Sequence, residues 1–172
     1  MKNKKSYAEK LMLYGVPVQF AIGALLHFLY DLTGENVFVS TFSPINESIW
    51  EHMKLVWLPI ILWYVLIYFL KKDKNEIDRN KWFFSSYIAF VVSFISIPTI
   101  FYLYTGVLGF ESVVVDILIL LVALILGYLA AKHFYRYSDG AGLVFSVIGF
   151  IVAYAVFILF TFYQPDLPIF YF

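Results

Sequence analysis

The sequence predicts an all-α, polytopic membrane protein with five transmembrane helices. The composition is the first indication, because 62% of the 172 residues are hydrophobic and only 14% are charged, with a mean hydropathy of +0.82. The second is that five apolar segments are each long enough to cross about 30 Å of hydrocarbon, which takes about 20 helical residues. The third is that the charged residues gather between these segments. This length suits one domain, so we expect a single membrane domain over residues 1–172.

The first span is expected at about residues 11–32. A basic tail precedes it, as in a signal peptide, but the apolar run is longer than the core of a signal peptide and lacks a small-x-small cleavage site. We therefore expect this segment to be retained as the first helix. Four further apolar runs follow it along the chain. They are expected at about 53–70, 82–104, 113–135 and 143–163.

Small residues predict how the last two spans pack. Helices in lipid associate through close contact of small residues and through hydrogen bonds between helices. Spans four and five each carry a stripe of small residues, and only the short turn "YSDGAG" separates them. We therefore expect these two helices to pack against each other as an antiparallel hairpin. The stripes are Ala123, Gly127 and Ala131 in span four, and Gly142, Ser146, Gly149 and Ala153 in span five.

The positive charges predict the orientation of the protein. Cytoplasmic loops of membrane proteins carry an excess of lysine and arginine, and every such residue except Lys54 falls on one side of the five spans. The N-terminus is therefore expected in the cytoplasm and the C-terminus outside. Membrane topology explains the basic residues, so the sequence predicts the lipid bilayer as a partner and no nucleic acid. The chain has no cysteine, which excludes disulfides and thiolate ligands.

The stretch "FSPINESIWEHMK", before and into span two, concentrates the polar chemistry of the chain. Ser43 and Pro44 are typical of an N-cap and of the first residue of a helix. We therefore expect a capped helix that begins in the outer loop at Ser43 and continues into span two. Glu47 would lie in its first turns, where the helix dipole favours an anion. The spacing also places Glu47 on the same face as Glu51 and Lys54.

Span one contributes a second polar group. Gln19, His27 and Asp31 are separated by multiples of four residues, so they lie near one face of a helix. An ionisable residue at membrane depth normally faces a partner or a water-filled cavity. Imidazole and carboxylate groups together suit Zn²⁺, Mn²⁺ or Fe²⁺, and an all-oxygen subset suits Ca²⁺ or Mg²⁺. We therefore expect a site near the outer surface that uses both groups.

The cofactor is unknown from the sequence, and one interpretation is a site that holds a divalent metal as its cofactor and includes two catalytic carboxylates. The predicted metal ligands are His27, Glu51, His52 and Asp116; the catalytic carboxylates are Glu47 and Glu51; further polar residues of the site are Asp31, Asn46, Trp50 and Gln19. The alternative is a solvated, capped helix in which Glu47 or Glu51 only contacts Lys54. The two interpretations differ in whether the side chains converge in space.

The same stretch resembles the signature of a family of small bacterial integral membrane proteins of unknown function. The segments "LLHFLYDLTGEN" and "FTFYQPDLPIF" extend the likeness over most of the chain. At the tail the family often has Tyr-Pro-Pro-His where this chain has "YQPD". The resemblance implies a helical, multi-pass protein of the bacterial plasma membrane and implies no known reaction. The matching residues are Ser43, Pro44, Asn46, Glu47, Ser48, Trp50, Glu51, His52 and Lys54.

Three functions remain open from the sequence. The first is a metal-dependent hydrolase of a lipid or other amphiphile, in which the metal activates water. The second is a transport component that binds an ion or small solute, which an acidic outer mouth between helices would admit. The third is a non-enzymatic membrane scaffold, in which the polar stretch locks helices together or docks a partner. Whether the chain is an enzyme therefore depends on whether the polar side chains meet in one place.

Overall fold

The protein is all-helical in the part of the chain that its computed structural model describes, residues 2–71 and 77–171, and this part contains no strand. Side chains are described from residue 7 onward. Two basic residues of the predicted inner loop, Lys72 and Lys74, lie outside the described residues. The helices are α1 (Lys2–Leu32), α2 (Val37–Ser40), α3 (Ile49–Lys71), α4 (Arg79–Leu108), α5 (Val113–Tyr137), α6 (Gly142–Phe162) and a final 3₁₀ helix (Pro168–Phe170).

Five of these helices are long and apolar enough to cross a membrane, which confirms the predicted fold class. The apolar spans agree with the predicted segments to within about four residues at each end. Helix α1 itself starts well before its span, at Lys2, because the basic tail contains good helix formers and nothing that breaks a helix. The spans are Tyr7–Leu32, Ile49–Lys71, Arg79–Leu108, Val113–Tyr137 and Gly142–Phe162.

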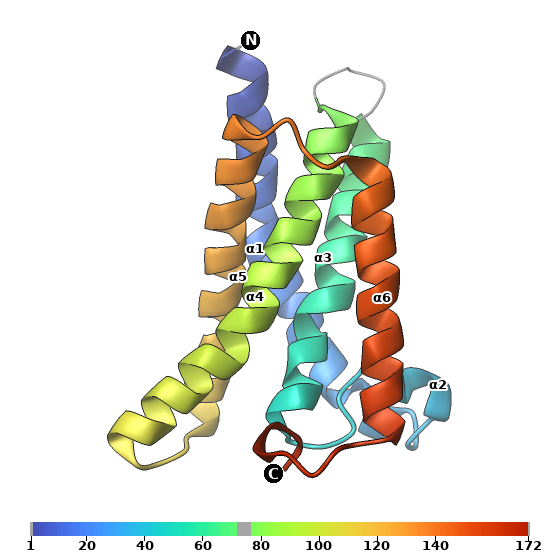
Figure 1. Ribbon diagram of the computed structural model, residues 1–172, viewed down its shortest axis with the longest axis vertical. Coiled ribbons are helices and arrows are strands. Elements are labelled where there is room, and N and C mark those ends of the chain that lie inside the picture. The colour runs from blue at the N-terminus through green and yellow to red at the C-terminus, as the bar shows by residue number, and fades with distance from the viewer. Residues whose placement is uncertain (1, 72–76, 172) are drawn as a thin grey trace.

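Helix α4 lies between α5 and α6, so the predicted hairpin of the last two spans is wrong (Figure 1). The connection at residues 138–141 crosses the end of α4, and Gly140 takes a positive φ of 79° there beside Asn80 and Lys81. The small residues of α5 and α6 therefore pack on two sides of α4. The Ser93 hydroxyl of α4 donates to the Ala123 carbonyl of α5 over 2.9 Å. The stripes were identified correctly as packing surfaces, but their partner is α4.

Gly127→Ala is expected to lower the free energy of unfolding by about 1–3 kcal/mol, the usual cost of overpacking. A Cβ atom at residue 127 would lie 2.6 Å from the carbonyl oxygen of Ala89, which belongs to the backbone and cannot turn aside. Unfolding in mixed micelles with increasing SDS measures the loss. Gly106→Ala in the same helix bundle is the matched control, because a Cβ atom there meets no other atom within 4 Å. An equal loss in both variants would contradict the close packing of α4 and α5.

Helix α3 is joined to three neighbouring helices by tryptophan hydrogen bonds. The indole N–H of Trp63 donates to the Leu11 carbonyl of α1, and that of Trp57 donates to the Phe150 carbonyl of α6. The indole N–H of Trp82 in α4 donates to the Tyr64 carbonyl of α3. Each bond satisfies a buried or half-buried donor and fixes the axial position of one helix relative to its neighbour.

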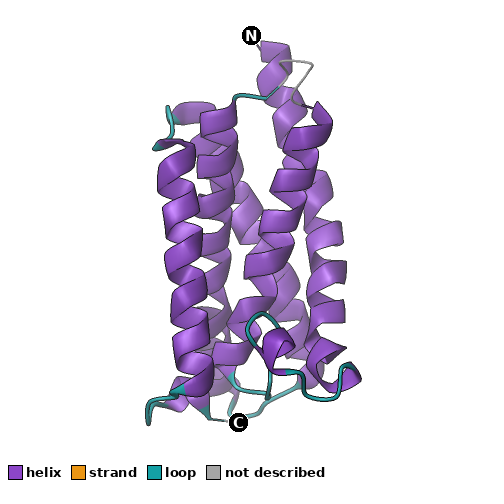
Figure 2. Cartoon of the chain, turned by 90° about the vertical axis from the view of Figure 1, so that its right-hand side faces the viewer, coloured by secondary structure: helices purple, strands orange, loops and turns teal. Residues whose placement is uncertain are grey.

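The two ends of the bundle differ in what they carry (Figures 1 and 2). One end holds the N-terminus and residues 138–141, and the other holds α2, the loop at residues 41–48 and the C-terminal segment. At the first end, Arg136 donates two hydrogen bonds to the Glu9 carboxylate, at 2.9 and 2.7 Å. We call the second end the outer end, following the orientation that the lysine and arginine residues predict. This end carries the candidate site.

Candidate metal site at the outer end

The loop before α3 is not the helix start that the sequence predicts. Helix α3 begins at Ile49, and residues 43–48 have no regular secondary structure. The hydroxyl of Ser43 does not cap a helix; it donates to the Leu26 carbonyl of α1 over 2.5 Å. Ser48 lies at the helix start instead, where its hydroxyl accepts from the Glu51 amide at 3.4 Å. A contact with another helix therefore outweighs the local preference of the Ser-Pro pair for starting a helix.

This loop turns Glu47 away from the face of α3. The side-chain oxygen of Asn46 accepts a hydrogen bond from the Ser48 amide at 3.0 Å, which closes a local turn around Glu47. Because Glu47 stands before the first helical residue, it does not share a helix face with Glu51 and Lys54 as the spacing predicts. The turn positions the Glu47 carboxylate between α1 and α3.

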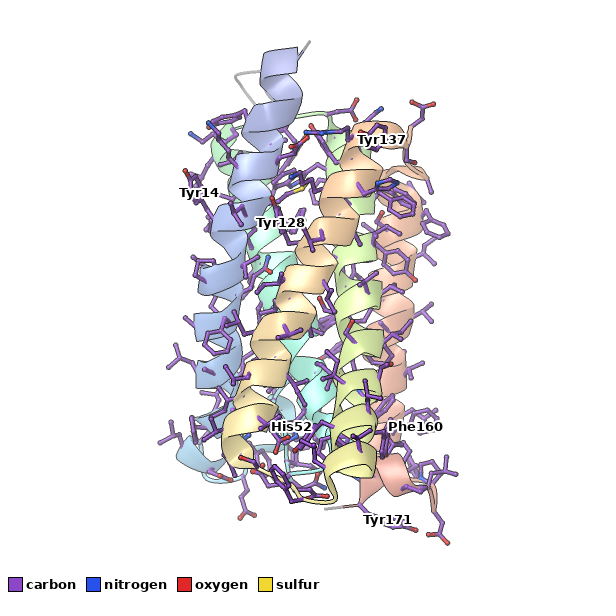
Figure 3. All side chains as sticks on the ribbon, turned by 90° about the vertical axis from the view of Figure 1, so that its left-hand side faces the viewer. Tyr14, His52, Tyr128, Tyr137, Phe160 and Tyr171 are labelled. Carbon is purple, nitrogen blue, oxygen red and sulfur yellow. The ribbon has the colours of Figure 1, made fainter. Side chains whose placement is uncertain are left out.

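Three ligand-type side chains from three separate segments meet at this place. His27 comes from α1, Glu47 from the loop and His52 from the first turn of α3. Their ligand atoms all lie within 4.8 Å of one another. The Nε2 atoms of the two histidines are 3.0 Å apart, and the Glu47 Oε2 atom lies 3.5 Å from each of them. Figure 3 shows His52 at the same end of the bundle as Tyr171.

The backbone orients one of the two imidazole rings. The Nδ1 atom of His52 lies 2.8 Å from the Ser48 carbonyl oxygen. A carbonyl oxygen only accepts, so Nδ1 carries the proton in this contact and Nε2 keeps its lone pair for the cluster. Metal-bound histidines commonly have this kind of second contact, which fixes the tautomer and the ring. His52 is therefore set as a ligand from its Nε2 atom.

The spacing of the three atoms matches a metal centre. A tetrahedral Zn²⁺ ion with ligands at about 2.0–2.1 Å separates its ligand atoms by about 3.3–3.4 Å. The observed separations of 3.0, 3.5 and 3.5 Å bracket this value. Two histidines and one glutamate also form a known set of protein ligands in catalytic zinc sites, which keep a fourth position open. The geometry thus suits a metal with one position free.

The cluster is open to water and bordered by apolar side chains. The Glu47 side chain is 70% exposed, whereas those of His27 and His52 are 26% and 21% exposed. Phe28 follows His27 directly and is exposed, as are Leu32 at the end of α1 and Phe38 in α2. Exposed apolar residues at the end of a membrane bundle are typical of the lipid–water boundary. The cluster is therefore open to water, and the helices that adjoin it carry exposed apolar side chains.

Glu51, predicted as a ligand and a catalytic group, is engaged elsewhere. Its carboxylate forms an ion pair with Lys54 at 2.5 Å, and the exposed fractions of the two side chains are 0% and 1%. The same Oε2 atom accepts from the Ile45 amide at 3.0 Å, and Oε1 accepts from the Thr161 hydroxyl at 3.2 Å. Both oxygens of Glu51 are thus occupied by protein donors, and the cluster of the three ligand-type side chains does not include it.

Asp116, the fourth predicted ligand, is held by α4. Its Oδ1 atom accepts from the Tyr104 hydroxyl at 2.7 Å. The Tyr104 oxygen in turn accepts from the Ser112 amide at 3.3 Å. Asp116 therefore fastens the turn between α4 and α5, and the cluster does not include it either.

The remaining predicted site residues take three different positions. Asp31 is exposed one helical turn beyond His27 on α1, and Gln19 is buried two turns before it. Trp50 is buried, and its indole N–H has no hydrogen-bond partner among the described residues. Its ring packs in an aromatic cluster at the start of α3. The cluster partners of Trp50 are Phe94, Phe157, Phe160 and Phe170.

Ser48 is a residue of the site that the sequence analysis missed. Its carbonyl oxygen accepts from His52 Nδ1, and its amide donates to the Asn46 side chain. Its hydroxyl accepts from the backbone amide of Glu51 at the start of α3. The sequence contains a signal for it, because Asn followed two residues later by Ser is typical of a turn closed by the asparagine side chain. The role of its carbonyl carries no sequence signal, because every residue has one.

Together these observations define a protein with five membrane-spanning-type helices and a His-Glu-His cluster at one end of the bundle. The chain belongs to a family of unknown function, DUF6512, whose model matches residues 1–172. The expectation of membership in a family of unknown function is thereby confirmed. No match was found among curated proteins or among solved structures.

Proposed function

We propose that this protein binds one divalent transition metal through His27, Glu47 and His52. We propose that it uses this metal to hydrolyse a lipid or other amphiphile at the external surface of the membrane in which it lies. The observation that carries the proposal is the convergence of three ligand atoms from α1, the loop and α3 within 4.8 Å. Such a convergence requires α1, the loop and α3 to be folded together, since residues 27, 47 and 52 are not neighbours on any one helix. The proposed ligand set differs from the predicted one in taking Glu47 in place of Glu51 and Asp116.

A donor set of three side chains would support a hydrolytic reaction. A divalent metal held by three protein ligands makes hydroxide available from water near neutral pH and polarises the bond to be cleaved. In the proposed mechanism His27, Glu47 and His52 would hold the metal, which would supply activated water, and the exposed carboxylate of Asp31 would accept a proton. Asp31 suits this role because it lies one turn from His27 on the same helix face. Glu51 takes no chemical step, since protein donors occupy both its oxygens.

The surroundings of the cluster support an amphiphilic substrate. The exposed Phe28, Leu32 and Phe38 side chains lie on the segments that flank the cluster. A substrate with an apolar chain can stay in the bilayer beside these residues while its polar linkage reaches the water-exposed metal. A small polar solute would gain nothing from this apolar border.

The buried face of α3 favours hydrolysis over transport. A conduit for an ion needs polar groups along its length. On α3, the buried residues beyond the cluster and the Lys54 pair are apolar down to Tyr64: Leu55, Val56, Pro59 and Ile60. The polar cluster thus lies at one end of an apolar stretch of the buried face of α3, which supports chemistry at the surface.

The full-length protein, purified in mild detergent without chelators, is expected to contain about one transition-metal ion per chain. Elemental analysis of the protein measures this ratio. Glu47→Gln is expected to weaken metal binding by about tenfold or more, because it removes the only anionic ligand while preserving side-chain size. Competition with a chelator of known affinity measures the change.

Glu111→Gln is the matched control, since Glu111 is an exposed carboxylate in the connection between α4 and α5. Absence of stoichiometric metal, both in the purified protein and after incubation with Zn²⁺, Mn²⁺ or Fe²⁺, would overturn the proposal. The identity of the bound metal, from the same elemental analysis, bears on the type of reaction. Two histidines and one carboxylate also hold Fe²⁺ in non-haem oxygenases, so native iron in a protein that hydrolyses no amphiphile would contradict the hydrolytic part of the proposal.

A further inference from the structure

A completely buried ion pair lies directly beside the candidate metal site. Glu51 and Lys54 are 0% and 1% exposed, and their charged atoms are 2.5 Å apart. Removing two charges from water costs several kcal/mol for each ion, and apolar residues of similar size often stabilise a protein as well or better. An ionisable pair within a membrane-spanning helix is therefore an expensive way to fill space, which points to a role other than packing.

The pair binds the loop that carries Glu47 at two points, just before its start and near its middle. Just before the start of the loop, the Lys54 ammonium donates to the Ser40 carbonyl at 2.8 Å. Nearer to Glu47, the Glu51 carboxylate accepts from the Ile45 amide at 3.0 Å. Ser40 is the last residue of α2, where carbonyl groups lack partners within the helix, and Ile45 lies in the segment without regular secondary structure, so neither backbone group is satisfied by a helix of its own.

Helix α6 is connected to the same pair. The Thr161 hydroxyl accepts from Lys54 at 3.0 Å and donates to Glu51 at 3.2 Å. Thr161 itself is buried near the end of α6. The pair is thus fixed on two sides, by α3 through its own backbone and by α6 through Thr161. A group fixed in this way can hold a loop at a defined position.

The position of the loop decides whether Glu47 reaches the two histidines. The histidines stand on long helices, whereas Glu47 stands on the loop and is 70% exposed. We propose that the Glu51–Lys54 pair is a positioning unit that holds the loop so that Glu47 completes the metal site. This inference rests on the proposed metal site and adds the residues that assemble it. It also assigns Glu51 a positioning role in place of the predicted ligand role.

The first test replaces the pair with apolar residues of similar size, Glu51→Leu with Lys54→Met in one chain. The double variant buries no charge, so it is expected to fold and insert like the wild type. Its loop loses both anchors, and its affinity for Zn²⁺ is expected to fall by about 10- to 100-fold, as for other residues that orient metal ligands. Chelator competition on the full-length protein in detergent measures the affinity, and unfolding in SDS measures stability in the same samples.

Glu51→Asp is the second test, and it protects the experiment against misfolding of the double variant. Aspartate keeps a negative charge beside Lys54, but its side chain is one methylene shorter and cannot also reach the Ile45 amide. Zn²⁺ affinity is expected to fall by about tenfold, and the visible spectrum of the Co²⁺-substituted protein is expected to change as Glu47 leaves the metal. A pair that serves stability alone would leave both readouts unchanged in the folded variant.

The control replaces another ion pair in the same way, Glu9→Leu with Arg136→Met. This pair joins α1 to α5 at the opposite end of the bundle, so its loss should leave Zn²⁺ affinity unchanged. Wild-type affinity in Glu51→Asp, or in a folded double variant, would overturn the positioning role while the metal site stands. A wild-type protein that binds no metal would instead overturn the proposed function and, with it, this inference.

Discussion

Lys54→Met, made alone, is expected to lower the free energy of unfolding by about 3–5 kcal/mol, the largest stability effect that this structure predicts. The variant keeps the Glu51 carboxylate, which is 0% exposed, but removes the cation 2.5 Å away from it. An uncompensated buried charge costs far more than the intact pair contributes, because its desolvation is no longer offset. The variant also leaves the Ser40 carbonyl without its donor.

Reversible unfolding in mixed micelles measures this loss. The double variant Glu51→Leu/Lys54→Met is the control, because it removes the stranded charge and should recover most of the stability. Lys81→Met is a second control, since the Lys81–Asp139 pair at the other end of the bundle involves a fully exposed carboxylate and is expected to contribute about 1 kcal/mol or less. A loss in Lys54→Met no greater than that in Lys81→Met would contradict the buried state of the pair.

The helices could be predicted from the sequence because the bilayer imposes their length and composition. An apolar run of about 20 residues has few alternatives to a spanning helix, since no other open structure satisfies its backbone groups in lipid. The neighbours of each helix could not be predicted in the same way. The stripe through Gly127 fits any close partner, and in the structure it lies against Ala89 and Ser93 of α4, while the path of residues 138–141 carries α6 to the other side of α4.

The candidate site was predictable in part for a related reason. His27 stood out because an ionisable residue near the end of an apolar helix requires a partner, and His52 stood out within the one polar stretch. The exchange of roles between Glu47 and Glu51 could not be foreseen. Both are carboxylates close to His52 in sequence, and the difference lies in the loop, where Ser43 binds α1 instead of capping α3. That choice is made by a tertiary contact that no local pattern encodes.

His52→Ala is expected to remove the metal and to lower hydrolysis of an amphiphile by about 10³-fold or more. The metal contributes several kcal/mol to the transition state, and each 1.36 kcal/mol corresponds to a factor of ten in rate. The loss should be larger than for Glu47→Gln, because His52 is the ligand whose ring the Ser48 carbonyl orients. The measurement uses protein reconstituted in phosphatidylcholine vesicles with three fluorogenic amphiphiles, joined by an ester, an amide or a phosphodiester.

His133→Ala is the matched control for this substitution. His133 is exposed on α5 at the opposite end of the bundle, beside Tyr137, and has no place in the metal site. Turnover by His52→Ala at the rate of His133→Ala would contradict a role for the metal in the reaction. A wild-type protein that holds its metal but cleaves none of the three linkages would contradict hydrolysis and leave the metal site intact. Turnover tests the reaction at the metal, whereas metal content tests binding by the three ligands. The two measurements therefore separate the chemistry from the binding.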